Sequence, residues 1–520
     1  MKFFTTLVRY VESTGLKRSL LTVIAWICIR VFFEGVFEST HQIGYIPFSY
    51  KSLVVYFLHF PLFYISLFLI LVIITALITG EHIRRVTGAC ASGLGLIILV
   101  PLIDWFAGGG YTITYPSRIG PYLLGALNPF ISIIDYGGSP GQRIILSIIC
   151  ICLALYSYVK TKKIGMGILL FLASYFIIVI FGGLPTIVAG NRPETVFVTG
   201  GILYSDTQKF AAIFLLLSII SGGCYMLLFD REKFAMVLRS LRPERALFYA
   251  GMGFFGLFLS LHQQGISIFS TFPSLFDTIG IIVMLVGLAA GFQCAAAFND
   301  FYDLAEDSVT RSRNPLVRGL DSTYYTWWTG ALCVTAMLCS LLLNYIALLI
   351  MITYLAIGVL YSMPPIRFKR IPIVATFVLA AAVILSMALG YSLITGSTAL
   401  NQMPRSILLP TLIGITLGFM AKDIHDSKAD RVSGVYTVPA LFVVGKGRLN
   451  RMPVAVIIGF SYLCYALFIK ELLWGALVFS AATIIYTMMV RTAKEWVYFV
   501  LLYLFGGYLV IIINRLPTLP

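Results

Sequence analysis

Long apolar segments recur along almost the whole chain, and they constrain its fold more than any other feature. Hydrophobic residues make up 59% of the 520 residues, and charged residues only 11%. An apolar run of ~20 residues is long enough to cross a bilayer as a helix. The runs do not alternate between apolar and polar residues, as the strands of a membrane barrel do. We therefore predict an all-α fold, a polytopic bundle of membrane-spanning helices.

The apolar segments predict about fifteen spans. The first is long enough to span and lacks the features of a cleaved signal peptide, so we expect a retained helix. The approximate cores are 19–37, 52–79, 87–107, 141–159, 164–188, 209–228, 247–269, 275–298, 325–343, 345–361, 372–395, 406–421, 453–469, 472–490 and 496–513.

The distribution of Lys and Arg predicts the orientation of these spans. Most of the 37 basic residues fall in alternate connections, which is the positive-inside pattern. The pattern places the N-terminus in the cytoplasm. The formal net charge of +15 therefore does not indicate nucleic-acid binding, and no soluble segment carries a basic stripe with interleaved aromatic residues.

The nine cysteines all lie within apolar segments, and none has the spacing of a metal site. We interpret them as small buried hydrophobic residues, without a disulfide framework or a zinc site.

A charged segment at 230–245 divides the chain. Six predicted spans precede it and nine follow it. We expect two parts, a membrane region at 1–240 of unknown role and a nine-span domain at 241–520. The acidic residues of the front part form no recognisable constellation.

Two stretches of the back part repeat the same acidic spacing, each at the cytoplasmic end of an apolar segment. Carboxylates at i, i+3 and i+7 share one face of a helix. Acidic residues beside membrane-buried segments are costly, so matched clusters indicate a site. The six candidate catalytic and metal-binding residues are Asp300, Asp303, Asp307, Asp423, Asp426 and Asp430.

Six neighbouring carboxylates require compensating charge. Two Mg²⁺ ions and a diphosphate, with basic side chains around them, would provide it. The basic candidates beside the clusters are Arg311, Arg313, Lys422, Lys428 and Arg431. The alternative is that each cluster is a solvated helix end with weak surface ion pairs.

Taken together, these motifs resemble the UbiA superfamily of intramembrane prenyltransferases. The NDxxDxxxD motif is matched by Asn299 and the first three aspartates. The second motif, DxxDxxGDxxxG, is matched by the other three and Gly434, with Ala429 in place of the usual glycine. The YSxPPxRxKR loop corresponds to Tyr361–Arg370, and Arg242-Pro243 matches the opening before the first helix. The resemblance covers about 241–520 and does not extend to 1–240.

The resemblance implies Mg²⁺-dependent transfer of a polyprenyl group from its diphosphate to an acceptor, inside the membrane and among its lipids. It also implies that Asn299, Arg367 and Lys369 join the basic candidates in binding the substrate. The acceptor stays open among aromatic, lipid, phosphosugar and carotenoid molecules. Two other functions remain as alternatives, a catalytically silent lipid-binding or assembly protein and a cation-coupled transporter.

Overall fold

The structure is a computed structural model, and it divides the chain into two compact units. The front unit is Met1–Ala235 and the back unit is Met236–Pro520. Each is described by itself below. The residues that the structure describes are 2–33, 50–107, 115–116, 118–127, 139–190, 201–266, 275–304, 307–308, 313–395, 397–424, 427, 437–444, 448–490 and 494–516.

The predicted all-α membrane architecture is confirmed. Thirteen helices among the described residues are long and apolar enough to cross a membrane. Two further predicted spans are helical but fall outside that set. Leu16–Phe33 contains Lys17, Arg18 and Arg30 within its 18 residues, and Arg451–Ala466 has only 16 residues. A segment of that length is short of the ~20 residues that a membrane core requires.

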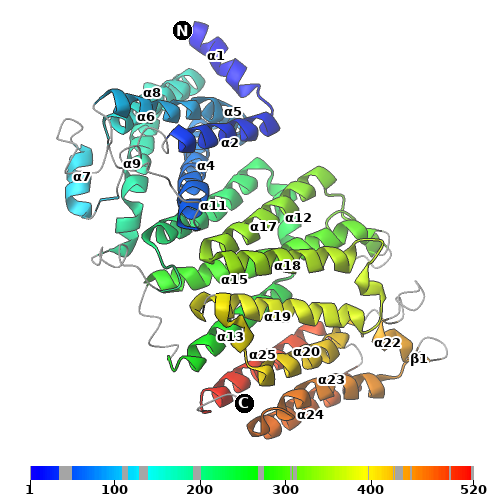
Figure 1. Ribbon diagram of the computed structural model, residues 1–520. Coiled ribbons are helices and arrows are strands. Elements are labelled where there is room, and N and C mark those ends of the chain that lie inside the picture. Colours follow the sequence, from blue (N-terminus) through cyan, green and yellow to red (C-terminus); the bar gives the residue numbers. More distant parts are fainter. Residues whose placement is uncertain are drawn as a thin grey trace. The chain divides into compact units, whose positions relative to one another are not determined.

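The front unit consists of helices over the described part of its length (Figure 1). Several spans are made of consecutive helical pieces, so that η2 with α4, and α5 with η3 and α6, each form one crossing. The elements are α1 (Lys2–Glu12), α2 (Leu16–Phe33), α3 (Tyr50–Leu53), η2 (Val54–His59), α4 (Phe60–Thr79), α5 (Ile83–Gly93), η3 (Leu94–Ile98), α6 (Leu99–Phe106), α7 (Ile119–Leu127), α8 (Pro140–Thr161), α9 (Ile164–Ala189) and α11 (Asp206–Phe229).

The helix α12 (Arg231–Ser240) leads from the front unit into the back unit. In the back unit, nine long helices of the described part pack side by side (Figure 1). They are α13 (Pro243–Gln263), α15 (Leu275–Tyr302), α17 (Ser322–Leu343), α18 (Tyr345–Ser362), α19 (Val374–Thr395), α20 (Arg405–Gly418), α23 (Arg451–Ala466), α24 (Leu473–Met489) and α25 (Glu495–Ile513).

Shorter elements connect these helices. Two short strands pair in an antiparallel ladder, with Val443 opposite Leu449 and Val444 opposite Arg448. The connecting elements are η5 (Phe368–Arg370), η6 (Ser397–Gln402), η7 (Phe419–Asp423), α22 (Val438–Leu441), β1 (Val443–Val444), β2 (Arg448–Leu449) and η8 (Lys470–Leu472).

Side-chain caps set several helix starts. Asp321 accepts a hydrogen bond from the backbone N–H of Tyr324 at the start of α17, and Asn344 accepts one from Ala347 at the start of α18. Such caps satisfy backbone donors that the first turn of a helix leaves without an intrahelical partner. The Asn344 cap separates α17 from α18.

Glycine allows α13 and α19 to approach closely. A Cβ added at Gly256 would lie 1.9 Å from the carbonyl oxygen of Met387, and one at Gly390 would lie 1.8 Å from that of Gly253. Neither glycine has room for a side chain. Small residues permit this kind of backbone contact between membrane helices.

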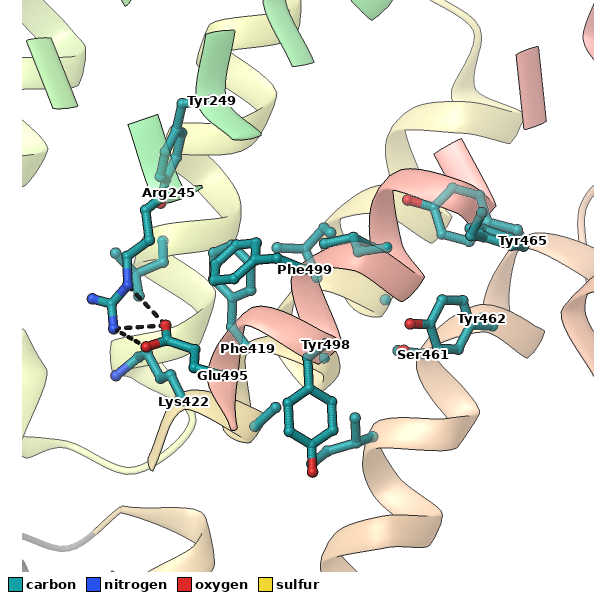
Figure 2. A pocket seen from close by; sticks show the side chains of 18 of the residues that line it. Arg245, Tyr249, Phe419, Lys422, Ser461, Tyr462, Tyr465, Glu495, Tyr498 and Phe499 are labelled. Atoms are coloured by element: carbon teal, nitrogen blue, oxygen red, sulfur yellow. Dashed lines mark hydrogen bonds and ion pairs between the residues drawn. The ribbon is translucent and has the colours of Figure 1, made fainter. Parts of the chain in front are cut away.

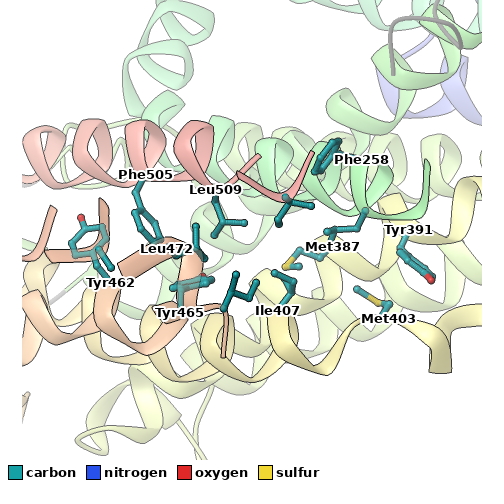
Figure 3. Packing of buried hydrophobic residues seen from close by; sticks show 14 residues of the cluster. Phe258, Met387, Tyr391, Met403, Ile407, Tyr462, Tyr465, Leu472, Phe505 and Leu509 are labelled. Atoms are coloured by element: carbon teal, nitrogen blue, oxygen red, sulfur yellow. The ribbon is translucent and has the colours of Figure 1, made fainter. Parts of the chain in front are cut away.

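A cluster of buried hydrophobic residues holds one end of the back unit together (Figure 3). It includes Phe258 of α13, Met387 of α19, Ile407 of α20 and Leu509 of α25. These residues come from the C-terminal halves of α13, α19 and α25 and from the first turn of α20. Ile407 lies at the start of α20, whereas Asp423 follows its end. Three further members of the cluster, Tyr462, Tyr465 and Phe505, also line the pocket described below.

Candidate active site

Asp300 lies in the last turn of α15 and is only 3% exposed. Both of its carboxylate oxygens have partners. Arg242 Nη2 donates to Oδ1 at 2.8 Å, and the hydroxyl of Tyr325 donates to Oδ2 at 2.8 Å. A buried carboxylate is stable when it is paired and hydrogen-bonded in this way. Asp300 therefore ties the start of α13 and the first turn of α17 to the end of α15.

Asp303 lies just beyond α15 and contacts two basic side chains. Arg367 Nη2 donates to its Oδ1 at 3.0 Å, the ammonium of Lys369 contacts the same oxygen, and Asn299 Nδ2 donates to Oδ2 at 2.6 Å. The structure thus brings together three residues that the sequence predicted from two separate motifs. The side chain of Asp303 is 13% exposed, so it remains more accessible than that of Asp300.

Arg367 adopts a left-handed backbone conformation, with φ of 43°. For a residue other than glycine this costs ~1–2 kcal/mol. Its guanidinium group donates both to Asp303 and, at 3.2 Å, to the carbonyl oxygen of Tyr302. These two contacts offset the backbone cost and direct the loop between α18 and α19 onto the end of α15.

Asp307, the third aspartate of the first motif, is held by Asn314. The Asn314 amide nitrogen donates to Asp307 Oδ2 and to the backbone carbonyl of Asp300, each at 2.8 Å. Asn314 is 1% exposed, and its own Oδ1 accepts from the backbone N–H of Leu316. The segment after the first motif therefore folds back onto it. Of the two arginines predicted here, Arg313 is exposed, and Arg311 lies outside the described residues.

The second motif is described only at its start. Asp423 is the last residue of η7, a 3-10 turn that continues α20, and Lys422 Nζ donates to its Oδ1 at 2.6 Å. The first acid of this motif thus follows a 3-10 turn instead of the expected α-helical one. Four predicted site residues lie outside the described residues, namely Asp426, Lys428, Asp430 and Arg431.

A hydrogen bond brings α18 to the first motif. Ser362, the last residue of α18, donates to Asn299 Oδ1 at 2.9 Å. Lys422, in the turn that follows α20, lines the same pocket as Phe292 of α15. Helix α15 and the turn after α20 are therefore neighbours, although they are more than a hundred positions apart in the sequence.

An aromatic pocket begins beside Lys422 and runs into the unit. Its polar end is formed by Lys422, Arg245 and Glu495, and its inner walls include Tyr462 and Tyr465 of α23 (Figure 2). Further wall residues are Tyr249, Phe292, Phe419, Tyr498, Phe499 and Phe505. The pocket is apolar inside with charged groups at one end. Its volume of about 80 Å³ is below the ~300–1,000 Å³ typical of small-molecule sites, so a long apolar chain would extend beyond it.

The carboxylates of the first motif fit a hard divalent cation by their chemistry, because Mg²⁺ prefers oxygen ligands. Both oxygens of Asp300 and of Asp303 already have protein partners, and Asp307 Oδ2 accepts from Asn314, so a bound cation would replace some of these contacts. Within the described ranges, no three acidic, His or Cys side chains gather closely enough to hold a metal ion.

Sequence reasoning missed Asn314 and Tyr325, which make hydrogen bonds to motif residues but carry no charge and belong to no acidic cluster. Ser362, which donates to Asn299, fell within the loop Tyr361–Arg370 without an assigned role. For Asn314 the local signal was the Asn-Pro pair at 314–315, which is typical of turns.

The comparison with protein families decides the identity of this fold. The model of the UbiA prenyltransferase family matches residues 246–513, just over half of the chain. The chain belongs to the UbiA prenyltransferase family. The predicted resemblance is thereby confirmed, and the match covers all nine long helices of the back unit, apart from the first residues of α13.

Solved structures of UbiA homologues are similar to this chain at low identity. A homologue from Archaeoglobus fulgidus bound to DMAPP and Mg²⁺ is 20% identical, with a TM-score of 0.38, and the match covers 54% of this chain and 99% of that one. A homologue from Aeropyrum pernix K1 is 22% identical, also with a TM-score of 0.38, over 53% of this chain and 100% of that one. The comparison with curated proteins found no match.

Proposed function

We propose that this member of the UbiA family transfers a polyprenyl group from a polyprenyl diphosphate to an acceptor, in a Mg²⁺-dependent reaction carried out by residues 241–520. The observation that supports it best is the position of Asp303. This carboxylate lies among Arg367, Lys369 and Asn299. Carboxylates for a metal and cations for phosphate oxygens are the two parts that a diphosphate site needs.

Three of the described site carboxylates are paired with cations before any substrate binds. Asp300 pairs with Arg242, Asp303 with Arg367 and Lys369, and Asp423 with Lys422. We infer that Lys369 and Lys422 exchange their carboxylate partners for diphosphate oxygens when the substrate enters. Both are compact cations on long flexible stems, so this exchange requires only a change of rotamer.

The bound metal ions, proposed to number two, would neutralise the leaving diphosphate and so promote cleavage of the allylic C–O bond. Asp300, Asp303, Asp307, Asp423, Asp426 and Asp430 are the proposed ligands. Asp300 also positions the end of α15 through its contacts with Arg242 and Tyr325.

The aromatic pocket is the proposed site of the prenyl chain. Its inner walls exclude water, and the faces of Tyr249, Phe419 and Phe499 can stabilise positive charge on an allylic carbon. Lys422 belongs both to the polar end of this pocket and to the ion pair with Asp423, so it joins the proposed diphosphate site to the proposed chain site.

The positive-inside pattern supports a cytoplasmic location for this site and for the N-terminus. Residues 1–240 would form a separate membrane region. The acceptor would be an aromatic, lipid, phosphosugar or carotenoid molecule.

The test uses the purified full chain in lipid nanodiscs with Mg²⁺, a labelled polyprenyl diphosphate and a native lipid extract. We expect label to move into a new lipid-soluble product, and Asp303→Asn to abolish this transfer. Glu471→Gln is the matched control, because Glu471 is an exposed acid far along the chain from both motifs, in η8. Transfer by Asp303→Asn at the wild-type rate would falsify the proposal, and ion flux without transfer would favour a transporter.

A further inference from the structure

The front unit contains a large cavity that the proposed transferase reaction does not use. Its volume is about 980 Å³, at the upper end of the ~300–1,000 Å³ typical of small-molecule sites. Residues of α1, α2, α4, α5, α7, α8, α9 and α11 line it, and all lining residues belong to Met1–Ala235.

Polar lining residues gather at one end of this cavity. The first, third and fifth crossings of the front unit begin on the same side of the membrane, with η2, α8 and α11 at their starts. The lining residues His59, Arg143 and Asp206 lie near these three starts. The polar end therefore lies toward one side of the membrane.

The charged residues at this end already have partners inside the protein. Arg30 is 1% exposed, and its guanidinium carbon lies 5.9 Å from the ring centroid of Tyr64. Arg30 and Arg143 each make further interactions within the chain. Asp104 accepts a backbone hydrogen bond at the start of α8 at 2.7 Å, and Asp206 accepts two from the residue that follows it. A charged ligand would have to displace these contacts, because a buried charge requires a partner.

The rest of the cavity is apolar and extends toward the other side of the membrane. Leu67 and Leu71 of α4 line its middle, and Val11 of α1 and Val159 of α8 line it near that other side. A long apolar chain would be removed from water along this wall, which favours its binding.

The hydroxyl groups that line the cavity indicate which uncharged head group fits. The hydroxyl of Tyr122 donates to the carbonyl oxygen of Val179 at 2.7 Å, and that of Thr207 donates to Asp206 at 3.2 Å. A hydroxyl has one proton and two lone pairs, so after donating it can still accept. These oxygens therefore match a head group that donates a hydrogen bond. Three further lining hydroxyls also donate to protein oxygens, those of Ser92, Ser147 and Tyr156.

We propose that this cavity binds an uncharged single-chain lipid alcohol. Its hydroxyl lies at the polar end and donates to the oxygen of Tyr122 or Thr207, and its chain extends past Leu71 toward Val11. A fatty acid or phospholipid fits less well, because its charge competes with contacts already made at the polar end. An ether of the same chain fits the apolar part but brings no proton to the hydroxyl oxygens. This proposal does not depend on prenyl transfer by the back unit.

Equilibrium binding to the purified full chain in phosphatidylcholine nanodiscs tests the proposal, because the bulk lipid then competes for the cavity. The probes are tritiated geranylgeraniol and its methyl ether, which keeps the chain but cannot donate a hydrogen bond. We expect saturable binding of the alcohol and at least about ten-fold weaker binding of the ether, the effect of one buried hydrogen bond. Equal binding of the two probes, or no saturable binding of the alcohol, would overturn the proposal.

A pair of unlabelled competitors tests the charge of the head group. Oleyl alcohol and oleate share one chain length and differ in the head. Oleyl alcohol should displace tritiated geranylgeraniol at least about ten-fold better than oleate. Equal displacement, or better displacement by oleate, would show that the head group need not be uncharged and would overturn that part of the proposal.

Because the back unit is itself proposed to bind prenyl chains, variants must locate the binding. The double variant Tyr122→Phe with Thr207→Val removes both hydroxyl oxygens and should weaken the alcohol about ten-fold. Binding of the ether should stay unchanged, which also shows that the cavity is intact. Tyr158→Phe is the control, because Tyr158 lies in α8 and does not line the cavity. Unchanged binding of the alcohol in the double variant, or an equal loss in the control, would contradict the proposed head-group position.

A second pair of variants tests the position of the chain. Leu71→Trp narrows the apolar part of the cavity and should weaken both probes together, by about ten-fold. Leu77→Trp on the same helix is the control, since Leu77 is 65% exposed and does not line the cavity. Unchanged binding in Leu71→Trp would place the lipid outside this cavity.

Discussion

Arg245 and Glu495 form a two-pronged ion pair, in which Nε and Nη2 of the arginine each donate to a different carboxylate oxygen at 2.8 Å. Arg245 lies in the first turn of α13 and Glu495 begins α25, so the pair joins the first and last long helices of the back unit. It also forms the polar end of the aromatic pocket (Figure 2). This ion pair therefore stabilises the polar end of the pocket.

Glu495→Ala should lower the free energy of unfolding by about 1–3 kcal/mol, because it leaves the arginine without its carboxylate in a partly desolvated position. The lower part of this range is expected, since the two side chains are 30% and 38% exposed. Thermal unfolding in detergent measures it. The double variant Arg245→Glu with Glu495→Arg should recover much of the loss. An equal loss in the double variant would show that packing, and not the charge pair, holds the two helices.

Both neighbouring aspartates of the first motif should contribute to stability. Asp300→Asn should destabilise the chain by about 1–3 kcal/mol, because it removes the buried carboxylate that pairs with Arg242 and accepts from Tyr325. Asp303→Asn should cost a similar amount, because it leaves Arg367 and Lys369, whose side chains are 13% and 12% exposed, without their carboxylate. It should also lower transfer at least about a hundred-fold. Unfolding curves for both variants and transfer rates for Asp303→Asn check this, and wild-type stability in either variant would mean that its ion pairs do not stabilise the fold.

Asp300 and Asp303 also show which features of the site could be predicted from the sequence. The spacing of the acids and the basic loop at 361–370 predicted a shared site, and Arg367 and Lys369 do meet Asp303. The spacing could not distinguish a buried carboxylate from an accessible one. That distinction depends on Arg242 and Tyr325, which reach Asp300 from helices 58 and 25 positions away.

The helices were predictable because a bilayer allows few alternatives to a ~20-residue apolar helix. Two of the fifteen predicted spans differ from the other helices in charge or in length. Three basic residues in Leu16–Phe33 and the shortness of Arg451–Ala466 separate these helices from the other spans. The 3-10 turn Phe419–Asp423 could not be predicted from the acidic spacing, because the other two acids of the motif follow it in the sequence.

Removal of divalent cations should abolish transfer, and added Mg²⁺ should restore it. A second measurement does not depend on turnover. Mg²⁺ together with a non-reactive diphosphate analogue should raise the unfolding temperature of the wild-type chain, since ligands that bind the folded state stabilise it. The rise should be absent in Asp303→Asn and retained in Glu471→Gln. An equal rise in Asp303→Asn would place the ion elsewhere.

Glu81, between α4 and α5, should make stability depend on pH. Burial alone would raise the pKa of Glu81, but hydrogen bonds and positive charge from Lys160 and Arg85 hold it below its ordinary value. A lowered pKa contributes stability above the ordinary value of ~4.3, and that contribution is lost as the pH falls through the pKa of the folded state. Glu81→Gln should therefore unfold at a lower temperature than wild type at pH 7, with the difference shrinking toward pH 4. A constant difference would contradict this assignment.

The contact of α13 with α19 gives the sharpest test of packing, because two glycines of the same helix have opposite surroundings. A Cβ at Gly256 would lie 1.9 Å from a carbonyl oxygen of Met387, whereas one at Gly251 would meet nothing within 4 Å. Gly256→Ala must push the two backbones apart and should cost about 1–3 kcal/mol, as other overpacked substitutions do. Gly251→Ala should be neutral or stabilising by up to about 1 kcal/mol, since alanine favours the helix. Unfolding in detergent measures both variants. Gly256→Ala should also reduce transfer, because α13 carries Arg245 and Tyr249 to the site and begins beside Arg242. Wild-type stability in Gly256→Ala would mean that the two helices are not in direct contact.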